Sequence, residues 1–202
     1  MHEPRVKICG ITNVEDGIFS NEHGADIIGV VRSSKSPRAG TAELINELTG
    51  IGIPVAGVYT EIGTVEEITS DENYVQLHFQ HGPQEITHVK KELGRKVISV
   101  VFAYKENSPF EKALEKLSQG ADLALLEYGS KGWNSGDRKI PEIKRHPVGI
   151  AGRVSIGNIG DLLRAHPYFI DVSSSLEVSP GKKDHSKISQ FMEVLKNEAA
   201  AV

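Results

Sequence analysis

Eight short apolar runs, each followed by a segment with helical character, limit the fold of this chain more than any other feature of the sequence. Several runs lack the alternation of a half-exposed strand, so we expect strands buried on both faces, as in parallel sheets. Strands are predicted at 5–9, 25–31, 54–59, 74–78, 96–102, 123–127, 148–151 and 169–172. Helices are predicted at 14–23, 41–49, 64–69, 84–93, 108–120 and 157–165, with a last one starting at Asp184 or Ser186.

Eight strand-then-helix units in 202 residues predict an α/β fold, a small (β/α)8 TIM barrel formed by the single domain 1–202. An open doubly wound sheet is the alternative, but the number of units favours a closed barrel. The regular pattern weakens after the sixth strand, where 129–139 is rich in glycine, serine and asparagine. We expect a loop there and a degenerate helix of one turn at 141–145.

Composition and charge exclude several classes of protein. The net charge of −4 provides no basic field for nucleic acid, and no apolar run is long enough to span a membrane. Cys9 is the only cysteine, so no internal disulfide can form, and a reducing cytoplasm is expected. We expect no metal site and solvated surface positions for five histidines without ligand spacing, namely His81, His88, His146, His166 and His185.

The carboxyl ends of the predicted strands identify the candidate functional residues. In α/β barrels this end carries the chemistry, because the loops that follow all strands meet there. Cys9 ends the first strand, and it is either a reactive group or a small buried hydrophobic residue. The other candidates at strand ends are Arg32, Arg38, Gln76, His78, Glu127, Gly152, Arg153, Asp171 and 173–175.

Two of these positions indicate ligand chemistry. Phosphate sites in such barrels lie after the last two strands, where 151–152 and the serine run 173–175 could form a cradle; plain turns are the alternative. Arg38, on a loop after a proline, suits a bidentate grip on a carboxylate. A solvated loop arginine is the other interpretation.

Four motifs in order resemble phosphoribosylanthranilate isomerase, the barrel enzyme of tryptophan biosynthesis. They lie at 7–12 (KICGIT), 36–38 (SPR), 75–78 (VQLH) and in the segments 171–174 (DVSS) and 179–184 (SPGKKD). The likeness extends from the first strand to the last helix. It implies substrate contacts from Lys7, Arg38, Gln76, His78 and Asp171.

The resemblance implies an Amadori rearrangement that needs no cofactor, metal or redox chemistry. N-(5-phosphoribosyl)anthranilate opens to a Schiff base and passes through an enolamine to the 1-deoxyribulose phosphate. The family's general base is the strand-one cysteine, hence Cys9, whose ordinary pKa of ~8.5 has to fall for it to act near neutrality. The family's general acid is an aspartate at the end of strand six, where this chain has Glu127.

Other departures from the family pattern surround the same end of the barrel. Asp137, in the loop after strand six, is a second candidate acid. Where the family has Ala-Gly-Gly, this chain has Ala151, Gly152 and Arg153. Arg153 either obstructs the phosphate site or adds its charge to it, beside Gly152 and Ser174. Ser175 replaces a glycine and can serve the cradle only if its φ stays negative or strain is tolerated. Trp133 is either a lid over the anthranilate ring or a packing anchor.

The partner is therefore expected to be a small phosphorylated substrate, with no nucleic acid or membrane, and the protein a monomer or homodimer. Two other functions stay open. One is isomerisation or epimerisation of a related sugar phosphate; the other is a non-catalytic barrel that binds phosphate ligands. The carboxylate kept at the end of strand six favours an enzyme, since a purely structural barrel does not require it.

Overall fold

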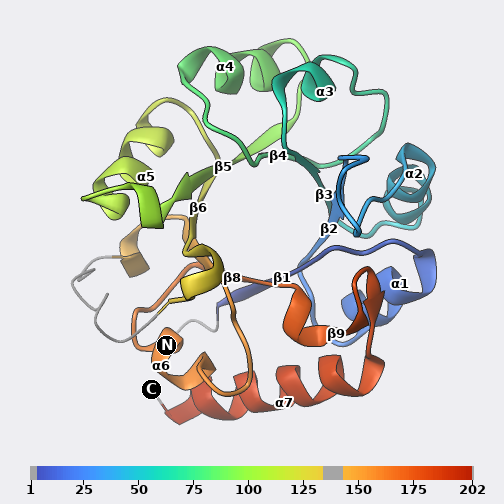
Figure 1. Ribbon diagram of the computed structural model, residues 1–202, viewed down its shortest axis with the longest axis vertical. Coiled ribbons are helices and arrows are strands. Elements are labelled where there is room, and N and C mark those ends of the chain that lie inside the picture. Colours follow the sequence, from blue (N-terminus) through green and yellow to red (C-terminus); the bar gives the residue numbers. More distant parts are fainter. Residues whose placement is uncertain (1–3, 134–142, 202) are drawn as a thin grey trace.

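The computed structural model describes residues 4–133 and 143–201, and within them eight parallel strands close into a barrel surrounded by helices (Figure 1). The barrel strands are β1 Arg5–Cys9, β2 Ile27–Val31, β3 Val55–Tyr59, β4 Tyr74–Leu77, β5 Lys96–Phe102, β6 Leu123–Glu127, β7 Val148–Ala151 and β8 Phe169–Val172. The helices are α1 Val14–Glu22, α2 Ala42–Gly50, α3 Ile62–Glu66, α4 Pro83–Lys91, α5 Pro109–Ser118, α6 Ile159–Leu163 and α7 His185–Ala201.

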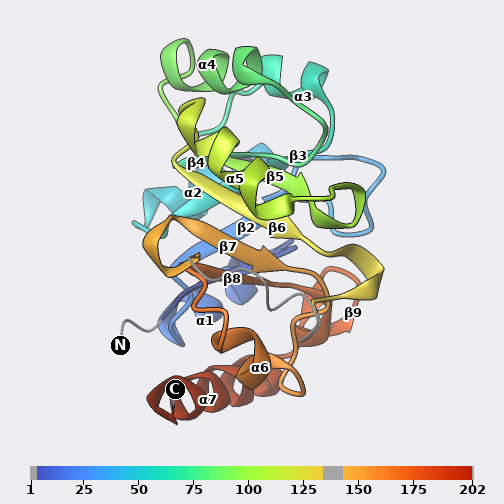
Figure 2. The same cartoon turned by 90° about the vertical axis from the view of Figure 1, so that its left-hand side faces the viewer.

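Closure depends on the parallel pairing of the first strand with the last. In this pairing Lys7 of β1 lies opposite Asp171 of β8, while on the other side Cys9 lies opposite Gly29 of β2. Figure 2 shows the strands stacked across the molecule between α3 and α4 at one side and α6 and α7 at the other. The predicted (β/α)8 barrel is confirmed, and the open sheet is wrong.

Side chains alternate between the inside of the barrel and the layer beneath the helices. Val6 and Ile8 of β1 belong to the large core cluster under the helices, so the intervening Lys7 and Cys9 face inward. A smaller cluster fills the barrel interior, with Ile98, Leu125 and Phe169 among its members. The inward Lys7 and Cys9 of β1, with the inward Asp171 of β8, are thus polar positions in a largely apolar barrel interior.

The connections between the strands agree with the sequence-based predictions in most places. One difference is the start of α3, and the other is a hairpin after β8. Helix α3 begins at Ile62, after Glu61, whereas the predicted start at Thr64 is wrong; the Thr64 hydroxyl donates to the Glu61 carbonyl from inside the first turn. Between β6 and β7 the described residues contain only two 3-10 turns, Gly129–Lys131 and Ile143–Arg145, as expected for a degenerate helix.

A small hairpin between β8 and α7 was not predicted. After β8 the chain makes a 3-10 turn, Ser174–Leu176, and then two short antiparallel strands, β9 Glu177–Ser179 and β10 Lys182–Lys183. In Figure 1 this hairpin lies beside α1, over the end of β1. The ammonium of Lys183 in this hairpin donates to the Cys9 carbonyl at 2.7 Å, so the hairpin contacts the end of β1.

Candidate active site

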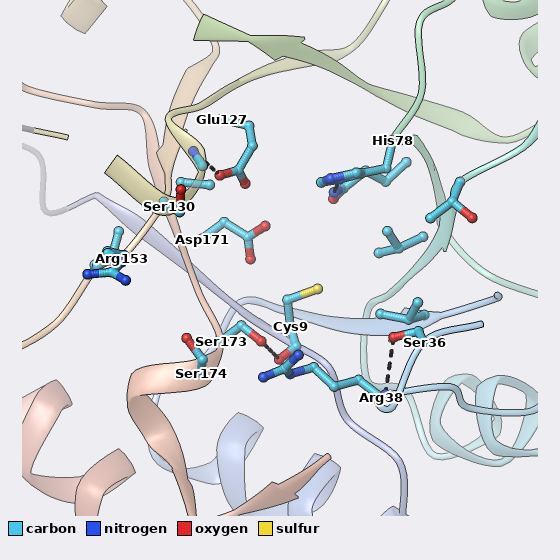
Figure 3. A pocket seen from close by; sticks show the side chains of 18 residues that line it. Cys9, Ser36, Arg38, His78, Glu127, Ser130, Arg153, Asp171, Ser173 and Ser174 are labelled. Atoms are coloured by element: carbon cyan, nitrogen blue, oxygen red, sulfur yellow. Dashed lines mark hydrogen bonds between the residues drawn. The ribbon is translucent and has the colours of Figure 1, made fainter. Parts of the chain in front are cut away.

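A cavity of about 460 Å³ opens at the carboxyl ends of the barrel strands (Figure 3). Its volume is in the range typical of small-molecule sites. The predicted residues that line it are Cys9, Arg38, Gln76, His78, Glu127, Gly152, Arg153, Asp171, Ser173 and Ser174. Lys7 and Ser175 are not among the lining residues.

Lys7 lies directly beneath the cavity and is fully buried. Its ammonium donates to both carboxylate oxygens of Asp171 at 3.1 Å. Burial lowers the pKa of Lys7, but the negative charges of Asp171 and of an ionised Cys9 more than offset this and raise it above its usual range. Lys7 therefore remains a cation, and it stabilises any negative charge that forms next to it.

Cys9 is partly exposed to the cavity, at the end of β1. Burial raises the pKa of its thiol above the ordinary value, although Lys7 and Lys183 act in the opposite direction. The sulfur has room only because Gly29 stands opposite on β2: a Cβ atom there would lie 2.8 Å from Cys9 Sγ and 2.8 Å from Lys7 Nζ. The resting group is accordingly a thiol beside a fixed cation.

Glu127 ends β6 and faces the same cavity. One of its carboxylate oxygens accepts a hydrogen bond of 2.7 Å from the Gly129 backbone N–H. Burial and the nearby Asp171 raise the pKa of Glu127, although the Gly129 N–H and Lys7 oppose the shift. A carboxyl group with a raised pKa can hold a proton and deliver it, as a general acid must. Asp137 lies outside the described residues.

Gln76 on β4 and His78, directly after that strand, form another part of the cavity wall. The Gln76 side-chain nitrogen lies 3.2 Å from His78 Nδ1, and the buried Gln76 Oε1 has no hydrogen-bond partner among the described residues. Burial, with a contribution from Lys7, lowers the pKa of His78 to about 4. A neutral imidazole therefore lines the cavity, beside a buried carbonyl oxygen that has no hydrogen-bond partner among the described residues.

The loops after β7 and β8 form the opposite rim of the cavity. Gly152 has φ +109°, and a Cβ atom there would meet the Gly129 nitrogen at 3.0 Å. Arg153 follows with φ +50° and an exposed side chain, which lies away from Cys9 in Figure 3. Ser174 lines the cavity, whereas the Ser175 hydroxyl donates to the Val154 carbonyl at 2.6 Å. Ser175 keeps a negative φ, so the missing glycine does not strain this turn.

Arg38 reaches the cavity from the loop between β2 and α2. Its Nε donates to Glu177 at 2.8 Å and its Nη2 donates to the same carboxylate at 2.8 Å. Arg38 is thus neither freely solvated nor blocked, since its side chain retains 27% exposure. Figure 3 shows it below Cys9, on the opposite side of the cavity from Glu127.

Comparison with known proteins shows the family of this chain. The family described as N-(5'phosphoribosyl)anthranilate (PRA) isomerase matches residues 6–194. The chain belongs to this family. The N-(5'-phosphoribosyl)anthranilate isomerase of Thermoplasma volcanium is 41% identical over 200 residues, 96% of each chain. That of Aquifex aeolicus is 34% identical over 210 residues, covering 96% of this chain and 99% of its own.

Solved structures of the family share the fold. The phosphoribosyl anthranilate isomerase from Thermotoga maritima superposes with a TM-score of 0.81 at 30% identity, covering 96% of this chain and 99% of its own. A family structure in complex with reduced 1-(o-carboxyphenylamino)-1-deoxyribulose 5-phosphate gives a TM-score of 0.79 with the same identity and coverage. Another structure concerns monomers generated from the dimeric Thermotoga maritima enzyme.

The structure decides the position of two further side chains. The sequence left two alternatives open for Trp133, and it predicted the wrong environment for His81. Trp133 has 5% exposure and belongs to the large core cluster, away from the cavity lining, which favours a packing anchor over a lid. His81 is buried with 9% exposure, and the predicted solvated position is wrong. Its ring bonds the Phe79 carbonyl on one side and the Ser99 hydroxyl on the other.

Three residues near the site were missed by the sequence reasoning: Gly29, Glu177 and Lys183. Gly29 stands in the middle of a predicted strand, where only its lack of a side chain marked it. Glu177 and Lys183 flank a Pro-Gly pair at 180–181, which is a turn signal that could have predicted the hairpin.

Within the described residues no helix is long and apolar enough to cross a membrane.

Proposed function

We propose that this chain isomerises N-(5′-phosphoribosyl)anthranilate to 1-(2-carboxyphenylamino)-1-deoxyribulose 5-phosphate. One observation carries the proposal: a thiol, Cys9, and a carboxyl group of raised pKa, Glu127, face one cavity that also receives Arg38. A general base, a general acid and a cation for the anthranilate carboxylate are what this Amadori rearrangement needs. Family membership supports the same assignment.

In the proposed reaction Glu127 acts first and Cys9 second. Glu127 gives its proton to the ribose ring oxygen as the C1′–O bond breaks, and the nitrogen lone pair forms the protonated Schiff base. The Cys9 thiolate then removes the C2′ proton, and the electron pair of that C–H bond forms the enolamine. Tautomerisation of the enolamine to the ketone completes the isomerisation without net oxidation or reduction.

We propose that Cys9 ionises only when substrate is bound. In the free protein burial keeps the thiol pKa high, so the thiol is protonated. The buried cation of Lys7, held by Asp171, and the positive Schiff base formed on ring opening both favour the thiolate. Cys9 releases its proton to solvent through the open cavity as the substrate binds, and the resulting thiolate takes the C2′ proton.

The remaining cavity residues are proposed to bind the two ends of the substrate. Arg38 receives the carboxylate, and Gln76 and His78 contact the sugar through a free oxygen and a neutral ring. The phosphate lies at the rim formed by Gly152, Arg153 and 173–175, where Ser174 offers its hydroxyl and Ser175 stabilises the turn. We also propose a cytoplasmic monomer or homodimer, consistent with the single free cysteine.

The test is a fluorescence assay with substrate generated in situ from anthranilate and phosphoribosyl pyrophosphate. Wild-type protein should remove the anthranilate fluorescence, and Cys9→Ala should lose most of the rate. Ser20→Ala is the matched control, because it also removes one buried polar atom but lies outside the cavity. Full activity in Cys9→Ala would refute the assigned base.

Absence of turnover in folded wild-type protein would refute the proposed substrate. Turnover of other aminosugar phosphates alone would then support a related isomerase. Thermal stabilisation by phosphate esters without conversion would instead support a binding barrel.

A further inference from the structure

The hairpin β9–β10 contains two buried charged side chains that the proposed chemistry does not use. Glu177 and Lys183 have side-chain exposures of 4% and 0%, and their charged groups lie 3.0 Å apart. Burying a charged side chain costs free energy unless it is paired with an opposite charge. We therefore expect both side chains of this hairpin to be buried because they hold partners. Both of them reach residues of the candidate active site.

Glu177 holds one edge of the Arg38 guanidinium. Nε donates to both carboxylate oxygens, at 2.8 and 3.1 Å, and Nη2 donates to one of them at 2.8 Å. A guanidinium carries five N–H donors in a rigid plane. Within 4–133 and 143–201 no hydrogen bond from Nη1 is present, so the edge formed by Nη1 and the second N–H of Nη2 stays available. That edge can grip a second carboxylate with two parallel hydrogen bonds.

Lys183 completes the arrangement from below. Its ammonium donates to Glu177 at 3.0 Å, to the Cys9 carbonyl at 2.7 Å and to the Ser173 carbonyl at 3.3 Å. Burial disfavours the charged form of Glu177, but Arg38 and Lys183 more than offset this and hold its pKa below the usual range. Glu177 is therefore a fixed anion tied to the backbone of β1.

We propose that Glu177, anchored by Lys183, is a positioning residue that aims the free edge of Arg38 at the carboxylate of the substrate. This inference rests on the proposed function. A loop arginine left alone would have to give up side-chain freedom on binding, a cost of about 0.5–1.5 kcal/mol that corresponds to roughly three- to tenfold in affinity. Glu177 removes that cost in advance, and only ligands with the carboxylate benefit.

The test is a comparison of two non-reacting ligands by titration calorimetry. One is reduced 1-(o-carboxyphenylamino)-1-deoxyribulose 5-phosphate, and the other is the same molecule with a plain phenyl ring. Wild-type protein should prefer the carboxylated ligand. Glu177→Gln should reduce that preference by roughly three- to tenfold, because it loses affinity for the carboxylated ligand and keeps its affinity for the plain one.

Two further variants separate positioning from structural damage. Adding Glu177→Gln to Arg38→Met should change nothing more, because Glu177 acts only through the arginine. Glu61→Gln is the matched control, since it removes a carboxylate from the exposed pair with Lys35, and it should leave both affinities unchanged. If Glu177→Gln does not fold, Glu177→Asp keeps the charge but shortens the reach and should reduce the preference in the same direction.

The outcomes distinguish this inference from the proposed function. Equal weakening of both ligands, or an added loss in the double variant, would overturn the positioning role while the proposed function stands. If wild-type protein binds neither ligand, the proposed function fails and this inference fails with it.

Discussion

Replacement of Gly29 by alanine tests the geometry beneath the cavity most directly. The added Cβ would lie 2.8 Å from Cys9 Sγ, 2.8 Å from Lys7 Nζ and 3.0 Å from Cys9 Cα. Because nonbonded carbon contacts are about 3.5–4.0 Å, the groups on β1 have to move by roughly 0.5–1 Å. Lys7 cannot turn aside without losing its contacts to Asp171. The Cys9 backbone is paired with Gly29 on β2, and its carbonyl accepts hydrogen bonds from the Ser173 hydroxyl and the Lys183 ammonium.

A displacement of about 1 Å in a catalytic group costs on the order of a hundredfold in rate, and overpacking costs about 1–3 kcal/mol of stability. Gly29→Ala should therefore lower kcat/KM by about a hundredfold in the fluorescence assay. Gly149→Ala is the matched control: its Cβ would lie 2.3 Å from Phe169, but Gly149 does not line the cavity. Both variants should lose stability, and only the first should lose the activity. A folded Gly29→Ala protein with near wild-type kcat/KM would refute the reasoning.

Two predictions concern pH. Glu127 donates a proton only below its raised pKa, so wild-type kcat should fall as pH rises through that value. Glu127→Gln should lower kcat by on the order of a hundredfold and remove this high-pH decrease from the kcat profile. A decrease that persists in the variant would contradict the assigned acid. The pKa of buried His81 is about 4 instead of 6.5, so the unfolded chain binds a proton that the folded chain excludes. Urea unfolding should therefore show stability falling as pH drops from 6.5 toward 4, and His81→Gln should flatten the slope; His78, with the same low pKa, accounts for the slope that remains.

The fold could be predicted because its main signal is local. Each barrel strand is an apolar run, and counting the runs was enough to predict closure. The start of α3 could not be predicted in the same way, because this helix has five residues and buries only Val65, so its own sequence does not determine where it begins. Short elements are placed by their neighbours more than by their own sequence.

The site was predictable to the extent that it follows from strand ends. Cys9, Gln76 and Glu127 line one cavity because parallel strands end at the same edge of the barrel. The partner of Arg38 was not predictable, because Glu177 lies 139 residues away and a charged loop residue carries no sign that it will be buried. Local patterns identify which residues reach the site, whereas the contacts that orient them depend on the complete fold.

The pairing of β1 with β8 has a consequence for how the protein folds. Lys7 and Asp171 are separated by 164 residues, so the counter-charge for the buried ammonium is synthesised long after the ammonium itself. Bringing such distant residues together costs chain entropy before any contact offsets it. We therefore expect a growing chain to keep the space around Lys7 hydrated until the last strand docks. The water around Lys7 would then be lost in the same late folding step that brings the active-site side chains together.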